Sequence, residues 1–306
     1  MKVIQYKSFG NSDVIELAER DKPQLKEDEI LIKTAAVSVN PADIKFRTGS
    51  MQARMPVQLP YIPGLDLSGI VEEIGNKITR IKPGDKVFGG KFGGTFAEYV
   101  TLKEEQSDII SSISSFNEAA SLVVPLVTAY SFLIEHGNVQ SGQKLFIQGI
   151  AGGTGIIVLQ MAKALGLHVT GTASAGGISL AESLGADKVI NYKTQDFLSQ
   201  IKEFDLVIDF VGGDTQAKSF QLLKRGGKLL SGVMPPSQEL AEQFGIEAKF
   251  VSSAYTFKKL NYGKEMVEKG LIKPQIAKIM KFEETANAQD MVSKGGIHGK
   301  IVLEIF

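Results

Sequence analysis

The sequence contains no cysteine among its 306 residues. This absence excludes disulfide bonds, thiolate catalysis and the zinc or iron–sulfur centres that cysteine holds. Histidine is also scarce, because only His136, His168 and His298 are present, widely spaced and without an HxxxH or HxxE pattern. We interpret each of the three as a surface or helix-end residue. The sequence therefore predicts no bound metal.

An excess of charge of one sign is equally absent. Lysine plus arginine and aspartate plus glutamate number 34 each, so the formal net charge is zero. A neutral chain creates no net field that would attract nucleic acid or an anionic membrane surface. No apolar run approaches the roughly 18 residues of a membrane span, and the N-terminal MKVIQYKSFG lacks the apolar core of a signal peptide. The sequence therefore favours a cytoplasmic protein without nucleic-acid or membrane partners.

Glycine, by contrast, gathers in one place. The apolar run Lys144 to Gln148 predicts a buried strand, and a glycine cluster follows it at once, formed by Gly149, Gly152, Gly153 and Gly155. A helix-forming stretch, Ile156 to Leu165, and a second strand, His168 to Ala173, come next. Strand, glycine turn, helix and strand are typical of a dinucleotide-binding βαβ unit, in which the glycines admit a pyrophosphate to the helix start. The alternative is a glycine-rich loop of purely structural use.

Strand and helix patterns continue to alternate after this unit. Further strands are predicted at Lys188 to Tyr192, Phe204 to Val211, Lys228 to Ser231 and Lys249 to Tyr255. Such alternation predicts a parallel, doubly wound sheet with helices between the strands.

The first part of the chain has a different pattern. Short β-prone runs alternate with turn signals such as Pro63-Gly64, and no helix-period stretch competes before Phe116. Two helices, one from Phe116 and one over Leu126 to His136, lead into the glycine unit, and residues 259–290 are predicted to be helical. We expect the last strand, near Gly299 to Ile305, to rejoin the first domain. The predicted domains are thus residues 1–118 (β-rich), 119–258 (doubly wound) and 259–306 (a return to the first domain).

In order and spacing, the turn landmarks of the chain resemble those of the medium-chain dehydrogenase/reductase superfamily, and in particular its zinc-free quinone oxidoreductase branch. The residues that carry the resemblance are Val39 to Asp43, Pro63 to Gly69, Lys82 to Val87, Gly94 to Val100, the glycine turn, Leu184 to Asp187, and Gly299-Lys300. The resemblance implies an α/β protein with a GroES-like β-rich catalytic domain and a Rossmann domain. Zinc members of the superfamily place a cysteine near position 38 and Gly-His-Glu near 64–66. Here Ser38, Leu65 and Asp66 stand there, which implies a reductase that uses a cofactor and no catalytic zinc.

The end of the second strand of the glycine unit indicates NADPH rather than NADH. NAD enzymes usually carry a carboxylate there, which would repel a 2′-phosphate. Residues 171–177 contain no carboxylate and offer the hydroxyls of Thr172 and Ser174 instead. The basic residue that many relatives carry is replaced by Gly176-Gly177, with Lys193 as the nearest substitute, so we expect a weaker preference. The alternative for Ser174 is a loop hydroxyl without a ligand.

The resemblance and the position of the strand ends together assign the expected cofactor-binding residues. They are Asn40, Thr128, Gly149, Gly152, Gly153, Thr154, Gly155, Thr172, Ser174, Tyr192, Phe210, Val211, Gly212, Ser231, Gly232, Val233, Gly299 and Lys300.

Hydride transfer needs little from the protein besides position, a dry pocket and a hydrogen bond to the oxygen that gains charge. The resemblance implies that Asn40 donates this bond and that Asp43 and Lys45, on the same loop, assist, with Lys45 donating to a carbonyl oxygen or delivering a proton. The alternative for Asn40 to Asp43 is an ordinary Asx-Pro turn. Tyr61 and Phe46 are candidates for an apolar wall of the substrate site, or equally for the core.

These observations predict an NADPH-dependent, zinc-independent reductase that transfers hydride to quinones or α,β-unsaturated carbonyls. Two alternatives stay open: an enone or alkenal double-bond reductase as the main activity, and a non-catalytic NADPH-binding protein of the crystallin type. The resemblance also implies a homodimer joined through the last strand of the doubly wound sheet, near Lys249 to Ala254.

Overall fold

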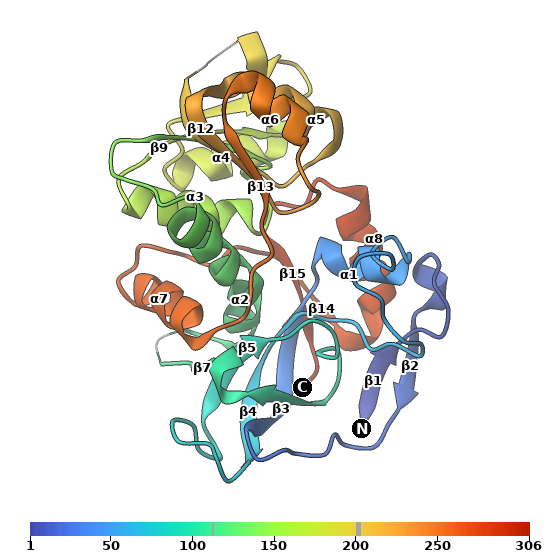
Figure 1. The fold of residues 1–306 in the computed structure, drawn as a ribbon. Coiled ribbons are helices and arrows are strands. Elements are labelled where there is room, and N and C mark those ends of the chain that lie inside the picture. Colours follow the sequence, from blue (N-terminus) through green and yellow to red (C-terminus); the bar gives the residue numbers. More distant parts are fainter. Residues whose placement is uncertain (112, 200–202) are drawn as a thin grey trace. The chain divides into compact units, whose positions relative to one another are not determined.

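The computed structural model describes residues 1–111, 113–199 and 203–306, which form two compact units (Figure 1). Residues 1–124, 255–264 and 274–306 form one unit, here called the β-rich unit, and residues 125–254 and 265–273 form the doubly wound unit. The domain boundaries after residues 118 and 258 stay predictions of where an independently folding domain begins and ends.

The doubly wound unit contains a parallel six-stranded sheet in the order β10-β9-β8-β11-β12-β13. Numbered along the chain from β8, this is the 3-2-1-4-5-6 order of a dinucleotide-binding sheet. Its strands are β8 (Lys144–Gln148), β9 (His168–Ala173), β10 (Lys188–Asn191), β11 (Phe204–Asp209), β12 (Leu223–Ser231) and β13 (Glu247–Phe250).

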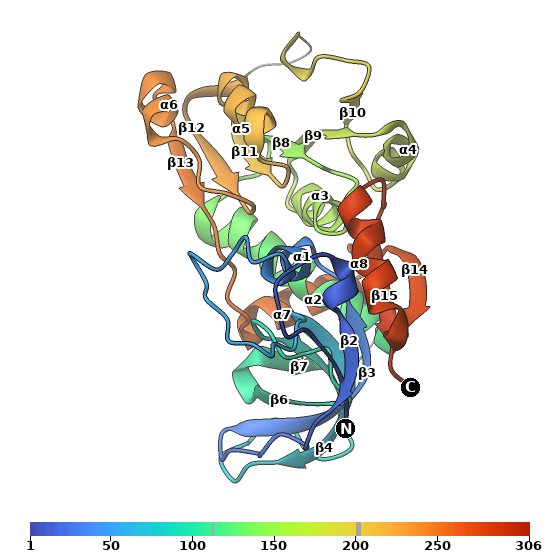
Figure 2. The same ribbon diagram turned by 90° about the vertical axis from the view of Figure 1, so that its right-hand side faces the viewer.

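Helices cover both faces of this sheet, with α3 (Gly155–Ala164) and α4 (Ala175–Ser183) on one face and α5 (Gly213–Ser219) and α6 (Gln238–Phe244) on the other (Figure 2). Because both faces are covered, the central strands are apolar along their length rather than alternating. Phe146 and Phe204 pack edge to face in this core, with ring centroids 5.1 Å apart.

The β-rich unit is built around β3 (Glu29–Ser38), which pairs antiparallel with β4 (Asp66–Ile74), β6 (Tyr99–Lys103) and β15 (Lys300–Glu304). The pairing of β15 with β3 confirms that the last strand rejoins the first part of the chain. The same sheet contains β5 (Lys86–Gly90), β7 (Ser107–Ile109) and β14 (Ile276–Lys281), and β1 (Lys2–Gln5) with β2 (Glu16–Glu19) forms a separate hairpin.

Several elements differ from the sequence prediction. The strand predicted at Lys249 to Tyr255 ends at Phe250, where β13 ends, and the residues after it are not a strand. Residues 259–290 are not all helical, because β14 lies between α7 (Phe257–Glu268) and α8 (Thr285–Lys294) and pairs parallel to β15. A helix that the pattern did not indicate, α1 (Pro41–Arg47), precedes Phe116; it has only seven residues, too few to show a period. The two helices predicted between Phe116 and His136 form one continuous helix, α2 (Phe116–Tyr130), extended by a π-helical segment, Ser131–His136.

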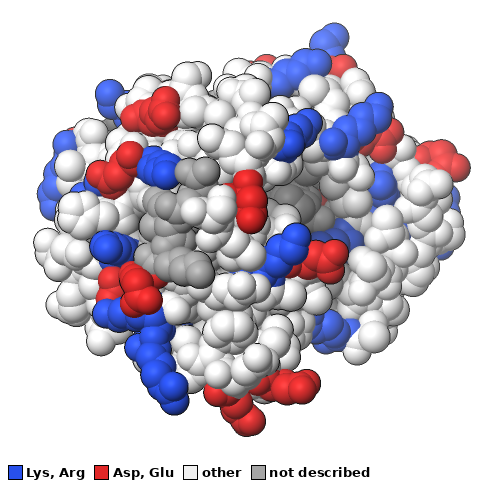
Figure 3. Space-filling view, turned by 90° about the horizontal axis from the view of Figure 1, so that it is seen from above, with Lys and Arg blue, Asp and Glu red and all other residues white. Residues whose placement is uncertain are grey.

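The continuous helix Phe116–His136 is long and apolar enough to cross a membrane, although no unbroken apolar run in it reaches that length. In its most apolar window, however, 72% of the surface is buried inside the folded chain. Burial of this kind is typical of a core helix. On the face of the molecule shown in Figure 3, lysines and arginines are interspersed with aspartates and glutamates rather than gathered in a patch of one sign.

Candidate active site

Asn40 and Asp43, two of the residues predicted to be catalytic, lie at the start of α1. Asn40 is the N-cap and Pro41 the first helical residue, which are favoured at these positions. The Asp43 carboxylate accepts the Asn40 backbone N–H at 2.8 Å and the Gly64 N–H at 3.1 Å, and its residue is only 1% exposed. Asp43 therefore ties the start of α1 to the Pro63-Gly64 turn and fixes where Asn40 stands.

The side-chain amide of Asn40 is fully engaged within the β-rich unit. Its Nδ2 donates to the Ser38 carbonyl oxygen at 3.2 Å and to Asp66 Oδ2 at 3.0 Å, and its Oδ1 accepts from Lys300 Nζ at 2.6 Å. An amide nitrogen has two hydrogens to donate, and both have acceptors here. Donation from Asn40 to a substrate oxygen would thus require the exchange of one of these bonds.

Asp66 and Lys300 complete this buried cluster. Asp66 accepts hydrogen bonds from the Ser38 backbone N–H at 2.9 Å and from Ser38 Oγ at 2.8 Å, and its Oδ2 lies 3.8 Å from Lys300 Nζ. Lys300 also donates to the Val39 carbonyl oxygen at 3.0 Å. Ser38 and Asp66, at positions where the superfamily's zinc members place ligands, thus bind each other and a lysine. Among the described residues, no group of three or more His, Cys, Asp or Glu side chains could hold a metal ion.

The cluster places two carboxylates and one ammonium group out of contact with water. Burial raises the pKa of Asp43 to about 7, and the charge of Asp66 adds to the rise, while Lys300 and the two N–H donors oppose it. Burial also raises the pKa of Asp66 and lowers the pKa of Lys300, although each partner favours the charged form of the other.

Tyr61 and Phe46, the predicted substrate residues, lie side by side with ring centroids 5.9 Å apart. Phe46 is 4% exposed and therefore belongs mainly to the core, whereas Tyr61 is partly exposed. Gly93 allows the tyrosine its position, because a Cβ at that residue would lie 2.2 Å from the Tyr61 hydroxyl. Burial, followed by the charge of Asp43, raises the pKa of Tyr61 to about 12, which keeps its hydroxyl protonated. Lys45 lies in the last turn of α1 and is also partly exposed.

The sequence did not reveal Tyr255. Its ring is 8% exposed and packs edge to face on Phe92 at 5.5 Å, and a Cβ at Gly90 would lie 2.7 Å from it. Burial raises the pKa of Tyr255 well above its usual value, and the charges of Asp66 and Asp43 add to the rise, which keeps its hydroxyl protonated. No pattern along the chain connects residue 255 with the Gly90 to Gly94 loop, since only the fold brings them together.

The glycine turn of the doubly wound unit has the geometry of a phosphate cradle. Gly149 has a φ of +80°, and a Cβ on Gly155, the first residue of α3, would lie 2.3 Å from the Gly149 carbonyl oxygen. Gly152, Gly153 and Thr154 lie between them, and Thr154 is the N-cap of the helix. The turn therefore needs glycine at these two positions, and it leads into a helix start, where anions bind.

Two of the predicted cofactor residues form hydrogen bonds that hold the loops after β8 and β12. Thr172 is 2% exposed, and its hydroxyl donates to Gln148 Oε1 at 2.6 Å and accepts the Gly149 N–H at 3.3 Å. Ser231 is fully buried, and its hydroxyl accepts the Val233 N–H at 3.3 Å. We therefore assign these hydroxyls to holding the loops rather than to facing a ligand.

The other predicted cofactor residues lie at loops or helix starts. Ser174 is the N-cap of α4, Tyr192 is 55% exposed just after β10, and Thr128 is a partly exposed residue of α2. Residues 210–212 follow β11 at its carboxyl end. Ser231 is the last residue of the neighbouring strand β12, and Gly232 and Val233 follow it. Gly299 serves the fold, because a Cβ there would lie 2.5 Å from the Gln275 carbonyl oxygen.

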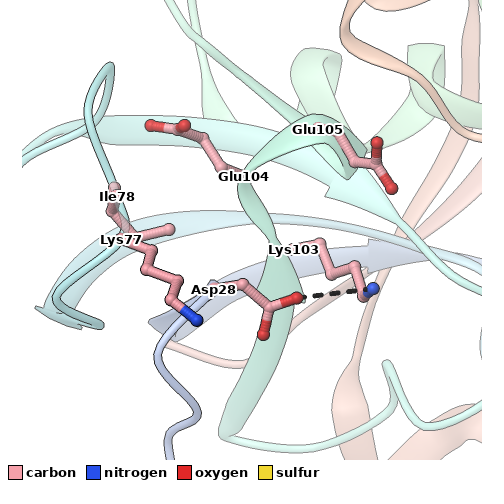
Figure 4. A pocket seen from close by; sticks show the side chains of 6 residues that line it. All are labelled: Asp28, Lys77, Ile78, Lys103, Glu104 and Glu105. Atoms are coloured by element: carbon pink, nitrogen blue, oxygen red, sulfur yellow. Dashed lines mark ion pairs between the residues drawn. The ribbon is translucent and has the colours of Figure 1, made fainter.

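A separate depression of about 290 Å³ lies on the β-rich unit and is lined by Asp28, Lys77, Ile78, Lys103, Glu104 and Glu105 (Figure 4). In it, Lys103 Nζ lies 3.4 Å from Asp28, and Lys77 bonds Glu27 at 2.8 Å just outside. Both lysines thus have acidic partners, and none of the predicted site residues lines the depression.

Comparison with known proteins places this geometry in a family. Residues 26–111 match the model of the alcohol dehydrogenase GroES-like domain, and residues 184–303 match that of a zinc-binding dehydrogenase. The chain is 33% identical to the 2-methylene-furan-3-one reductase of Solanum lycopersicum over 99% of this chain and 79% of that protein. It also superposes on the quinone oxidoreductase of Coxiella burnetii with a TM-score of 0.92 and 31% identity, over 100% of this chain and 99% of that one. The chain belongs to the quinone oxidoreductase branch of the medium-chain dehydrogenase/reductase superfamily.

A further quinone oxidoreductase structure, from Escherichia coli, was solved in complex with NADPH. It superposes on this chain with a TM-score of 0.91 and 25% identity, and each chain covers 100% of the other. The comparisons thus confirm the predicted family, with its GroES-like β domain and Rossmann-like parallel sheet, and they make the chain an oxidoreductase of the quinone oxidoreductase branch.

Proposed function

We propose that the protein is an NADPH-dependent reductase that transfers hydride to quinones or α,β-unsaturated carbonyls without a catalytic zinc ion. The observation that carries this proposal is the glycine cradle at Gly149 and Gly155, at the carboxyl end of the first strand of a 3-2-1-4-5-6 sheet. The tomato relative is named for an exocyclic enone, and the Escherichia coli relative holds NADPH.

The doubly wound unit offers the residues that would hold NADPH. The cradle and the start of α3 suit the pyrophosphate, and Ser174 and Tyr192, at the ends of β9 and β10, suit the adenosine phosphate. No carboxylate stands at residues 171–177 to repel a 2′-phosphate, which favours NADPH over NADH. When bound, NADPH supplies the hydride.

The β-rich unit offers the groups that would stabilise a reduced acceptor. When a hydride adds to an enone or quinone, its electron pair forms the new bond to hydrogen and the displaced π electrons end on the acceptor oxygen, where a hydrogen-bond donor stabilises them. Asn40, Lys45 and Tyr255 are the candidate donors, and Tyr255 fits best because its hydroxyl stays protonated while the Asn40 amide is engaged elsewhere. The proton that completes the reduction comes from solvent.

We also propose that the protein is cytoplasmic, and the family resemblance supports a homodimer joined along β13. This strand lies at the open edge of the doubly wound sheet, and open edges of this kind are normally paired or covered. One observation favours the second candidate function, a non-catalytic NADPH-binding protein, since both Asn40 amide hydrogens are already used inside the protein.

The deciding experiment follows the loss of NADPH absorbance with 1,4-benzoquinone, 9,10-phenanthrenequinone and 3-penten-2-one, before and after treatment with EDTA. We expect turnover that survives EDTA and is faster with NADPH than with NADH, and the best acceptor distinguishes quinone from enone reduction. Tight NADPH binding without turnover would support the non-catalytic candidate. Loss of activity with EDTA would contradict zinc independence.

A further inference from the structure

A buried carboxylate, Asp209, organises the two loops that follow β11 and β12. It is the last residue of β11 and is completely buried. Its Oδ1 accepts the backbone N–H groups of Val211 and Gly212, both at 2.9 Å, which fixes the loop after its own strand. Its Oδ2 accepts from Gln216 Nε2 at 2.8 Å and from Ser231 Oγ at 3.3 Å, and Ser231 is the last residue of β12.

The same network reaches the loop after β12. The Ser231 hydroxyl accepts the N–H groups of Val233 at 3.3 Å and Met234 at 3.4 Å, and Gln216 Nε2 lies 3.3 Å from the Met234 carbonyl oxygen. Met234 Sδ in turn accepts the Gly213 N–H at 3.2 Å, so the two loops are also joined directly. Their tips, Val211 and Met234, are 53% and 40% exposed and present apolar surface to whatever binds there.

The charge of Asp209 is not neutralised by a partner. Three of its four hydrogen bonds come from N–H groups, which can only donate, so both oxygens act as acceptors, as those of a carboxylate do. Across the described parts of the chain, no lysine, arginine or histidine forms an ion pair with it. Asp205, at the amino end of the same strand, differs in this respect because it pairs with Lys224.

The position of this charge relates it to one half of a dinucleotide. In a sheet of this strand order, the two halves of the cofactor lie on either side of the glycine turn. β9 and β10 follow that turn on the adenosine side, so the loops after β11 and β12 serve the nicotinamide side. The oxidised cofactor carries one more positive charge than the reduced one, and this charge is on the nicotinamide ring.

We propose that Asp209 is a positioning residue for the nicotinamide side of the site and that its unpaired charge stabilises NADP⁺ relative to NADPH. The inference rests on the proposed binding of NADPH. Through the four hydrogen bonds, Asp209 holds both loops in place. Through its charge, it favours the form of the cofactor that remains after a hydride has left, which helps a reductase to donate that hydride.

The test measures the dissociation constants of NADPH and NADP⁺ by fluorescence titration and displacement, for the wild type and for Asp209→Asn. We expect the ratio of the NADP⁺ constant to the NADPH constant to rise roughly tenfold in the variant, which corresponds to about 1.4 kcal/mol. Asp209→Glu keeps the charge and should keep the ratio within about threefold of the wild type. Ser231→Ala loosens the loops but keeps the charge, so it should weaken the binding of both cofactor forms by the same factor.

Asp205→Asn is the matched control, because it removes a carboxylate from the opposite end of β11 and should leave the ratio unchanged. An unchanged ratio in Asp209→Asn overturns the role of the charge. If circular dichroism shows that this variant does not fold, the affinities of Asp209→Glu and Ser231→Ala for NADPH and NADP⁺ decide. Binding of both cofactor forms that is weakened by the same factor supports the positioning role. Unchanged affinities for both forms overturn it. A wild type that binds neither form would instead contradict the proposed function.

Discussion

Asp43 shows how burial changes the chemistry of one side chain. An aspartic acid side chain in water has a pKa near 4. Asp43, however, faces two N–H donors, a second carboxylate and one lysine in a buried site. Its pKa of about 7 means that the folded protein holds a proton there under conditions in which the unfolded chain has lost it. The energetic consequence has a definite sign.

A folded-state pKa above the unfolded value favours the folded state at low pH and loses that contribution as pH rises towards the folded pKa. For Asp43 this window lies between the ordinary value of 3.8 and about 7. Asp43→Asn cannot ionise, so the wild type should lose stability relative to it as the pH rises. We expect the difference in unfolding free energy, variant minus wild type, to increase by on the order of 2 kcal/mol from about pH 5 to about pH 7. Urea denaturation at the two pH values measures this gap, and a gap that does not change with pH would contradict the assignment.

Tyr255 permits a test of the acceptor site by the loss of a single oxygen atom. Tyr255→Phe keeps the ring against Phe92 and Gly90 but removes the donor, so we expect turnover with an enone to fall about 10- to 100-fold. The NADPH dissociation constant should not change.

Tyr6→Phe is the matched control for this variant. The Tyr6 hydroxyl is also buried, and it has no hydrogen-bond partner in the described part of the chain, so its removal should leave turnover unchanged. Equal turnover in both variants would show that Tyr255 does not serve the acceptor.

At the scale of elements, Lys300 connects the last strand to the first helix. It begins β15 and reaches Asn40, the cap of α1, at 2.6 Å, although about 260 residues separate the two along the chain. Removing a buried cation leaves the facing carboxylate unpaired, which is more costly than removing the whole pair.

We therefore expect Lys300→Met to lower the unfolding free energy by about 3–5 kcal/mol and the double variant Asp66→Asn/Lys300→Met to lower it by less than the sum of the single changes. Chemical denaturation of the four proteins in this cycle measures the coupling. Strict additivity would mean that Asp66 and Lys300 do not depend on each other.

Elements also show where sequence reasoning succeeds and where it stops. Five strands of the doubly wound sheet and the return of β15 followed from apolar runs and glycine punctuation, because these are local signals, whereas the sixth strand was predicted several residues too late in the chain. β14 did not, because its sequence, IAKIMK, has no regular alternation of apolar and polar residues and lies within a stretch predicted to be helical. Only its pairing with β15 makes it a strand. Asp209 was missed because its partner Ser231 lies on another strand, and Tyr255 because Phe92 lies far from it along the chain; no spacing in the sequence reveals either pair.

At the scale of the whole molecule, the open edge of β13 is where we expect a second copy to bind. The Val251 N–H donates inward to the Ser231 carbonyl oxygen, and backbone N–H groups alternate along a strand, so the Ala248 N–H points to the open edge. We expect the wild type to be a dimer by sedimentation and Ala248→Pro, which removes that donor, to be a monomer with unchanged NADPH affinity. A wild-type monomer, or a variant that stays dimeric, would place the association elsewhere.

The threading of the chain through its two units sets the order in which they can be finished during synthesis. All residues of the doubly wound unit have been synthesised once the ribosome reaches position 273. The strand β3, by contrast, pairs fully only after β15, at residues 300–304, has been synthesised. The β-rich unit is therefore completed after the doubly wound unit. Until then Ala36 to Ser38 of β3 lack their partner, because β6 pairs only with residues 29–33 of that strand. A chain interrupted before β15 would therefore contain a complete doubly wound unit and an incomplete β-rich unit.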